Sequence, residues 1–188
     1  QVGIVMTLHQ RISSPFPYKK IYIVGVSGAG KSDLSARMSS TLAIPHVELD
    51  SLYWKPNWVG STHNEMNRNI QRELDKNKWL IDGRQDFSHD TLISAEAQVI
   101  IWLDLALYTI AYQVLKRTFL RALKREKLWA GNIENSWLAI VNWLRFTLGT
   151  YDRIRQKYFD QYARSTKESP VLIRLQDRRQ IKDFLATL

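Results

Sequence analysis

Cysteine is absent from the 188-residue sequence. Its absence excludes disulfide bonds, thiolate metal sites and cysteine nucleophiles, and it fits a reducing compartment, so we expect a cytoplasmic protein. Histidine is scarce as well. The four histidines, His9, His46, His63 and His89, show no metal-ligand spacing along the chain, so the sequence assigns none of them to a metal.

Long hydrophobic segments are also lacking. The nearest approach to a membrane span is residues 97–115, but Asp104 lies near its centre, where it would cost ~2.5–3.5 kcal/mol in a bilayer. A buried strand that runs into a helix explains the same residues without that cost. The N-terminal segment has no basic start before its short apolar run, which makes it a poor signal peptide. We therefore expect no membrane association.

Positive charge is abundant and unevenly placed. The net charge is +9, and residues 111–160 hold ten Lys or Arg against four Asp or Glu, a local net charge of +6. Such an excess favours an anionic ligand, either a nucleotide or a nucleic acid. The hydrophobic fraction of 45% and the length indicate one globular domain with a substantial core.

The segment "GVSGAGKS" at residues 25–32 fits the phosphate-binding pattern G-x-x-x-x-G-K-[ST]. Its glycines let the backbone N–H groups turn toward an anion, and the helix that begins near Lys31 adds its positive end. Lys31 would reach the β- and γ-phosphates of ATP, and the hydroxyl of Ser32 would ligate Mg²⁺. The predicted nucleotide-binding residues are Gly25, Ser27, Gly28, Ala29, Gly30, Lys31, Ser32 and Asp33.

Strands and helices alternate along the chain, which predicts a parallel α/β sheet. The expected strands are residues 20–26, 44–50, 78–83, 97–104 and 169–175. The expected helices are residues 32–42, 62–77, most of 107–163 with a break at 130–132, and 177–188, while the segment after residue 50 is expected to be an aromatic loop. We predict a three-layer α/β/α P-loop fold with five parallel strands: residues 1–18 form a tail, and residues 19–188 form one domain with a helical lid at 107–163.

Three of these strands end in aspartate, at Asp50, Asp82 and Asp104, and parallel sheets bind ligands at the carboxyl ends of their strands. Asp82 is our candidate for the magnesium side of the site, because Gly83 after it allows close ligand approach. Asp50 is a candidate for orienting or deprotonating an acceptor hydroxyl, or else it caps a turn. For Asp104 a helix-capping role is the better interpretation.

Two further groups of side chains are candidates for the site. Arg117, Arg121 and Arg125 are four residues apart and share a helical face, as expected of a lid that closes over a transferred phosphoryl group or of a solvated or nucleic-acid-binding surface. In "LYWKPNW" the aromatic residues lie close to Asp50, where they would stack on a planar acceptor or cover the core.

From Lys20 to Leu188 the sequence resembles the adenylate-kinase-like P-loop proteins known as DNA topology modulation proteins. The resemblance rests on "GVSGAGKS", "PHVELDSLYWKPNW", "WLIDG" and the basic stretch that ends in "KLWAGN". It implies the nucleotide-kinase fold, ATP and Mg²⁺ at residues 25–32, and adenine near residues 176–178. It also implies an acceptor near Asp50, Tyr53 and Trp54, and a lid that carries Arg117, Arg121 and Arg125.

The chain departs from this family at four places. Asp33 replaces the usual threonine, "DGRQDF" lacks the Asn-Tyr that follows Asp-Gly, and Ala130 and Ile133 replace an asparagine and an arginine. Arg84 would supply an acceptor contact from a shifted position. These departures leave a third interpretation open, in which the protein is a degenerate family member that binds ATP without turning it over.

The sequence thus predicts an ATP- and Mg²⁺-dependent kinase that phosphorylates a small acceptor, with nucleosides and nucleotides among the candidates. Its predicted catalytic residues are Lys31, Asp50, Asp82, Arg117 and Arg121. The alternative is a nucleic-acid-associated, ATP-binding regulatory protein with little or no kinase turnover.

Overall fold

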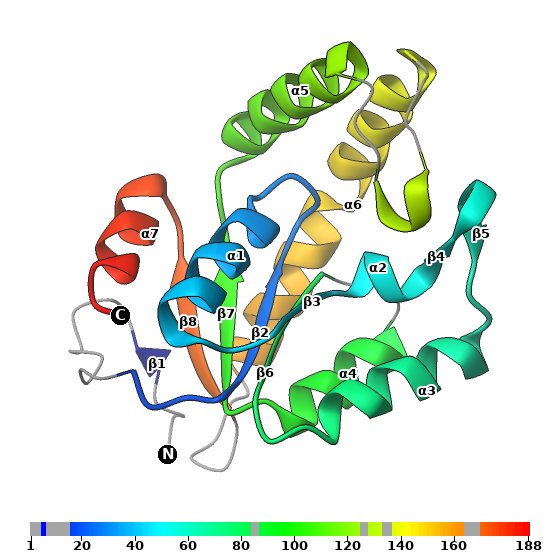
Figure 1. Ribbon diagram of the computed structural model, residues 1–188. Helices are drawn as coiled ribbons and strands as arrows, with labels where there is room; N and C mark the ends of the chain where they lie inside the picture. The colour runs from blue at the N-terminus through cyan, green and yellow to red at the C-terminus, as the bar shows by residue number, and fades with distance from the viewer. Residues whose placement is uncertain (1–4, 7–15, 84–86, 125–127, 133–136, 164–169) are drawn as a thin grey trace.

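The five expected strands form one parallel sheet in the computed structural model of the protein (Figure 1). The structure describes residues 5–6, 16–83, 87–124, 128–132, 137–163 and 170–188. The strands of the sheet, from one side to the other, are β3 (His46–Glu48), β6 (Trp79–Asp82), β2 (Lys20–Gly25), β7 (Val99–Leu103) and β8 (Val171–Leu175). A sixth strand, β1 (Val5–Met6), pairs with β8 from within the expected tail.

Helices cover both faces of this sheet (Figure 1). Those of the described residues are α1 (Lys31–Leu42), α2 (Leu49–Tyr53), α3 (His63–Leu74), α4 (Phe87–Glu96), α5 (Leu107–Lys124), α6 (Trp137–Ala163) and α7 (Arg178–Leu185). Helices α1 and α7 pack on one face, and α3, α4 and part of α6 pack on the other. The pair α5 and α6 extends beyond the carboxyl edge of the sheet, the edge at which the predicted phosphate loop lies.

The central strands are apolar along their whole length because both of their faces are covered. In β2, alternate side chains divide between the two cores. Ile21 and Ile23 pack with Leu34 of α1, whereas Tyr22 and Val24 belong to the cluster on the opposite face. The three-layer α/β/α architecture predicted from the alternating strands and helices is therefore confirmed.

Two segments differ from the sequence-based expectation. The expected aromatic loop after residue 50 contains α2, a 3₁₀ turn at Pro56–Trp58 and a hairpin of β4 (Trp54–Lys55) with β5 (Val59–Gly60). Helix α4 was not expected, because polar and small residues dominate Phe87–Glu96 and give it no clear apolar face. Short helices and short strands are fixed by tertiary contacts more than by local pattern, and this explains both differences.

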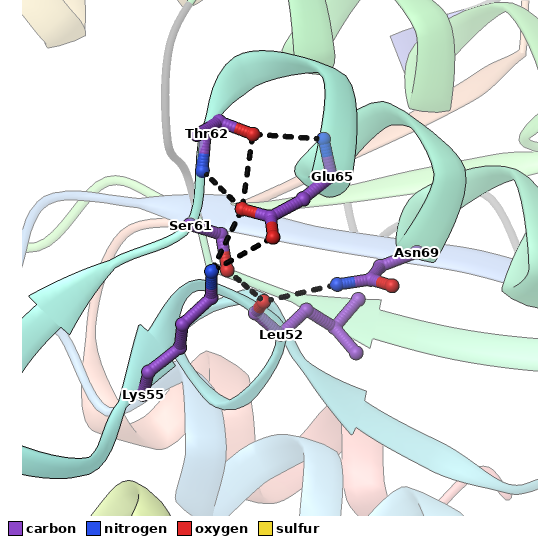
Figure 2. A network of polar contacts seen from close by, with 6 residues as sticks. All are labelled: Leu52, Lys55, Ser61, Thr62, Glu65 and Asn69. Carbon is purple, nitrogen blue, oxygen red and sulfur yellow. Dashed lines mark hydrogen bonds and ion pairs between the residues drawn. The ribbon is translucent and has the colours of Figure 1, made fainter.

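The aromatic hairpin is fixed to the start of α3 by a polar network (Figure 2). Thr62 is the N-cap of α3 and forms a capping box with Glu65. Lys55 of β4 donates to both carboxylate oxygens of Glu65 at 2.8 Å. The carbonyl of Leu52 accepts from Ser61 and from Asn69. Together these contacts hold the hairpin beside the carboxyl edge of the sheet.

Candidate active site

The phosphate-binding motif forms the turn between β2 and α1. Gly25, Gly28 and Gly30 have φ values of +146°, +84° and +92°. Residues other than glycine rarely adopt such values. A Cβ atom on Gly28 would also lie 2.3 Å from the Val114 side chain of α5. Two constraints therefore demand glycine at position 28, the backbone turn and the close approach of α5.

Lys31, the first residue of α1, extends back across this loop. Its ammonium group donates to the carbonyls of Gly25 at 3.0 Å and Val26 at 3.1 Å. Asp33, in the first turn of the helix, pairs with Arg37 at 3.2 Å, so part of its negative charge is offset beside the loop. The loop thus presents an ammonium group and a helix N-terminus at one point, an arrangement suited to phosphate.

A cavity of about 270 Å³ opens over the loop and brings five parts of the chain together. The loop side is formed by six of the eight predicted nucleotide-binding residues, with Lys31 among them. The opposite sides come from α2, the hairpin turn, α5 and the segment 128–129. The lining residues are Ser27, Gly28, Gly30, Lys31, Ser32, Asp33, Asp50, Trp58, Arg117, Leu128 and Trp129.

The structure therefore brings Asp50 and Arg117 to the same cavity as the phosphate loop. Arg121 lies on α5, but its side chain is outside the described residues, as are Arg84 and Arg125. Tyr53 and Trp54 are absent from the lining of this cavity. The ring of Trp54 packs edge-to-face against Tyr53, with 4.8 Å between the ring centres, and against Trp58, with 5.3 Å between the ring centres. Trp58 is thus the aromatic residue of "LYWKPNW" that reaches the cavity.

Asp82, at the end of β6, lies beside the loop and is only 3% exposed. Its Oδ1 accepts from the hydroxyl of Ser32 at 3.4 Å, so the two predicted metal-side residues are neighbours. Its Oδ2 lies 2.7 Å from Nε2 of His46. Hydroxyl and carboxylate oxygens suit Mg²⁺, and this pair therefore fits the metal that a phosphate loop uses.

Sequence reasoning missed His46 and Glu48 on the neighbouring strand β3. Glu48 is the register partner of Asp82, and its carboxylate accepts from the indole N–H of Trp129 at 2.6 Å. Residues two apart on a strand share a face, so "HVE" at the end of a strand was the available signal. The spacing of the four histidines along the chain does not reveal this pair.

Asn132 was also missed as a site residue. Its buried amide accepts from the backbone N–H of Trp58 at 3.1 Å and donates to the carbonyls of Lys55 and Trp129, both at 2.9 Å. It thereby joins the hairpin turn to the segment 128–132. Both joined turns contain non-glycine residues at positive φ, Asn57 and Trp58 in one and Ala130 in the other. The hydrogen bonds of the Asn132 side chain help to hold these strained conformations.

Asp104 has a different environment. It follows β7 and accepts from Nε of Arg155 at 2.8 Å and from Nε of Arg174 at 2.9 Å. The hydrogen bond that Arg155 donates to Asp104 raises the pKa of Arg155 above its ordinary value. The expected capping role is thus replaced by an ion-pair cluster that joins β7, β8 and α6.

A second cavity, of about 710 Å³, continues from the loop between α1, α5 and α7. Gly28 and Gly30 line both cavities, and Arg178 of α7 lines the second one. Arg178 belongs to the segment near which the sequence predicts adenine, and that placement stays a prediction.

The fold and the loop define the class: the chain has a P-loop fold of the nucleotide-kinase-like type. Three solved kinases share it. They are a sugar kinase from Janibacter sp. HTCC2649 (13% identity, 91% of this chain and 94% of that one, TM-score 0.51), a gluconokinase from Sinorhizobium meliloti 1021 (13%, 90% and 90%, 0.51) and a shikimate kinase from Bacteroides thetaiotaomicron (12%, 90% and 95%, 0.53).

Comparisons of sequence reach less far. No family model matches the chain. The uncharacterized protein YqaC of Bacillus subtilis (strain 168) is 33% identical over 67 residues, which are 35% of this chain and 38% of that protein. The specific resemblance to DNA topology modulation proteins is not confirmed by these findings. Within the described residues, no helix is both long and apolar enough to cross a membrane.

Proposed function

We propose that the protein is a kinase that transfers the γ-phosphate of ATP to a hydroxyl group of a small acceptor. The observation that carries this proposal is the cavity in which Lys31 and the phosphate loop face Asp50, Trp58 and Arg117. A phosphate-binding loop, a carboxylate that can accept a hydroxyl proton and an arginine meet there. These are the parts that phosphoryl transfer requires.

The chain's own residues have distinct tasks in this proposal. Lys31 and the loop N–H groups hold the β- and γ-phosphates, and Arg117, together with Arg121, stabilises the negative charge on the transferred group. Asp50 orients the acceptor hydroxyl and accepts its proton. Ser32 would ligate Mg²⁺, with Asp82 holding it through water. The bound cation would neutralise charge on the phosphate oxygens.

The cavity also limits the acceptor. Its volume of about 270 Å³ lies below the range of ~300–1,000 Å³ typical of ligand pockets, and the transferred phosphate takes part of that space. A nucleotide acceptor would need cations for its own phosphate, but the cations of the lining, Lys31 and Arg117, already serve the donor. We therefore favour a small hydroxy compound without a phosphate group, held between Asp50 and the ring of Trp58.

The kinase neighbours agree with this choice, since they are named for sugars, gluconate and shikimate. The alternative of a nucleic-acid-associated regulatory protein receives no support from the comparisons. It would require DNA binding with a steep salt dependence, together with ATP turnover that no acceptor stimulates.

The experiment is to measure ADP formation with Mg²⁺ across a panel of sugars, polyols, sugar acids, nucleosides and nucleotides. We expect turnover stimulated by one class of small hydroxy compound, and a loss of ~10²–10³-fold in Lys31→Ala, which removes a charged hydrogen-bond donor from the phosphates. Lys76→Ala is the matched control, because Lys76 pairs with Glu73 at the far end of α3. ATP binding without turnover on any acceptor would contradict the proposal.

A further inference from the structure

Three potential metal ligands meet at the carboxyl edge of the sheet, on its α1 face. Strands β3 and β6 are parallel neighbours, and their register places Glu48 opposite Asp82. His46 precedes Glu48 by two residues and therefore points to the same face. One ligand atom from each of His46, Glu48 and Asp82 lies within 4.8 Å of the other two.

The two oxygens of Asp82 face in different directions. Oδ1 faces the Ser32 hydroxyl at 3.4 Å, and Oδ2 faces His46 Nε2 at 2.7 Å. A cation held by His46, Glu48 and Asp82 would therefore use Oδ2, while Oδ1 stays directed toward the nucleotide side of the site. The cluster is a separate position that shares one carboxylate with the Ser32 side.

Burial and charge favour a cation at this cluster. The side chain of Asp82 is 4% exposed and that of His46 is 16% exposed, so solvent screens their charges poorly. Two carboxylates this close repel each other unless a cation or a proton lies between them. Glu48 is also held in place, because Trp129 donates to its Oε2 and leaves Oε1 available. Hydrogen-bonded carboxylates of this kind are typical of metal ligands.

We propose that His46, Glu48 and Asp82 bind a divalent first-row transition metal such as Mn²⁺. Mg²⁺ prefers oxygen ligands and retains most of its waters, whereas an imidazole nitrogen favours the transition metals. Three protein ligands leave the remaining positions to water. The inference does not depend on phosphoryl transfer, because the three side chains come together without a nucleotide.

The test is binding of Mn²⁺ alone to the nucleotide-free protein, followed by electron paramagnetic resonance. We expect Mn²⁺ to bind at least about ten times more tightly than Mg²⁺ in competition. Pulsed spectra should show coupling of the bound Mn²⁺ to an imidazole nitrogen. His46→Gln should lose that coupling and weaken Mn²⁺ binding by about tenfold or more. His63→Gln, which removes an exposed imidazole on α3, should change neither result.

Two results would overturn the inference. One is a wild-type protein that shows no nitrogen coupling, or that binds Mn²⁺ no more tightly than Mg²⁺. The other is a folded His46→Gln variant that keeps the coupling. If that variant does not fold, Glu48→Gln replaces it and should weaken Mn²⁺ binding while the nitrogen coupling remains. The presence or absence of nitrogen coupling in the wild-type spectrum then decides whether His46 binds the metal. Absence of kinase turnover would leave these results unchanged, so failure of the proposed function is distinguishable from failure of this inference.

Discussion

Asp82 and Asp104 lie at the carboxyl ends of β6 and β7, the two strands that flank the central strand β2, yet their partners differ in charge. Asp82 is the last residue of β6 and Asp104 follows β7, and both are buried, 3% and 7% exposed respectively. Asp104 is bound by two arginines, whereas Asp82 accepts from a serine hydroxyl and lies beside an imidazole nitrogen. The first carboxylate is compensated within the protein. The second is left oriented toward the phosphate loop.

We infer from this difference that an aspartate at a strand end can serve the fold or a ligand site, and that its neighbours decide which. Arg155 comes from α6 and Arg174 from β8, so Asp104 ties the returning helix to the sheet. Tyr151 of α6 supports the same junction by donating to the carbonyl of Leu105 at 3.1 Å. Among the described residues, no such cluster of arginines surrounds Asp82, and we propose that it faces a ligand instead.

Replacing Asp82 should give the largest effect on turnover. In Asp82→Asn we expect kcat to fall by ~10²–10³-fold, about 3–4 kcal/mol of transition-state stabilisation, because the metal-side charge is lost. The unfolding free energy should change by no more than ~1 kcal/mol, since the amide can keep a hydrogen bond to His46. Acceptor-dependent ADP formation and urea unfolding measure the two quantities, and normal kcat in the variant would contradict the assignment.

Asp104→Asn should show the opposite pattern. Removing one member of a buried ion pair costs ~3–5 kcal/mol, and the partial exposure of Arg155 reduces the expected loss to ~2–4 kcal/mol. Urea unfolding should detect this loss of stability. The kcat of the folded fraction should remain within about threefold of wild type, because Asp104 lines neither cavity. A loss of kcat as large as that expected of Asp82→Asn would contradict the assignment of Asp104 to the fold rather than to the site.

The two arginines of Asp104 should contribute unequally. Arg174 is 19% exposed and lies 4.9 Å from the ring centres of both Trp102 and Phe159, whereas Arg155 is 44% exposed. We expect Arg174→Gln to cost ~2 kcal/mol and Arg155→Gln ~0.5–1 kcal/mol. Equal losses in urea unfolding would show that burial and ring contact add nothing to the ion pair.

Replacing Glu65 should have the smallest effect on stability. Hydrogen bonds from Lys55 and Thr62 lower the pKa of this carboxyl group to about 2. Because this pKa is depressed in the folded state, its contribution to stability is complete above pH 4.5, the ordinary value. The contribution is lost as the pH falls toward 2. The unfolding midpoints of wild type and Glu65→Gln should therefore converge across this window. A constant difference down to pH 2 would contradict the assignment.

Features that a short contiguous segment specifies were predictable from the sequence. The glycines, Lys31 and Ser32 lie within one turn, and the alternation of apolar segments was enough to predict the parallel sheet. The sequence also predicted different roles for Asp82 and Asp104, but the structural role that it predicted for Asp104 was the wrong one. It suggested a helix cap for Asp104, because Arg155 and Arg174 lie 51 and 70 residues away and no local pattern points to them.

The features that were missed depend on how distant segments align. His46 joins Asp82 through the register of β3 against β6, which no spacing in the sequence reveals. Trp58, rather than Tyr53 or Trp54, reaches the cavity because a 3₁₀ turn redirects the chain at Pro56. The sequence therefore identified Lys31, Asp50 and Arg117, which line one cavity. It did not identify His46 and Glu48, or distinguish Trp58 from its aromatic neighbours.

The Asn132 amide also has a consequence for folding kinetics. Its bonds to Trp58 and Lys55 close chain separations of 74 and 77 residues, and those residues include β6 and β7 on both sides of the central strand. Contacts of such high sequence separation form after the strands between them have paired. Truncating this amide should therefore accelerate unfolding while the refolding rate stays unchanged, which places the junction among the last parts of the molecule to assemble and the first to open.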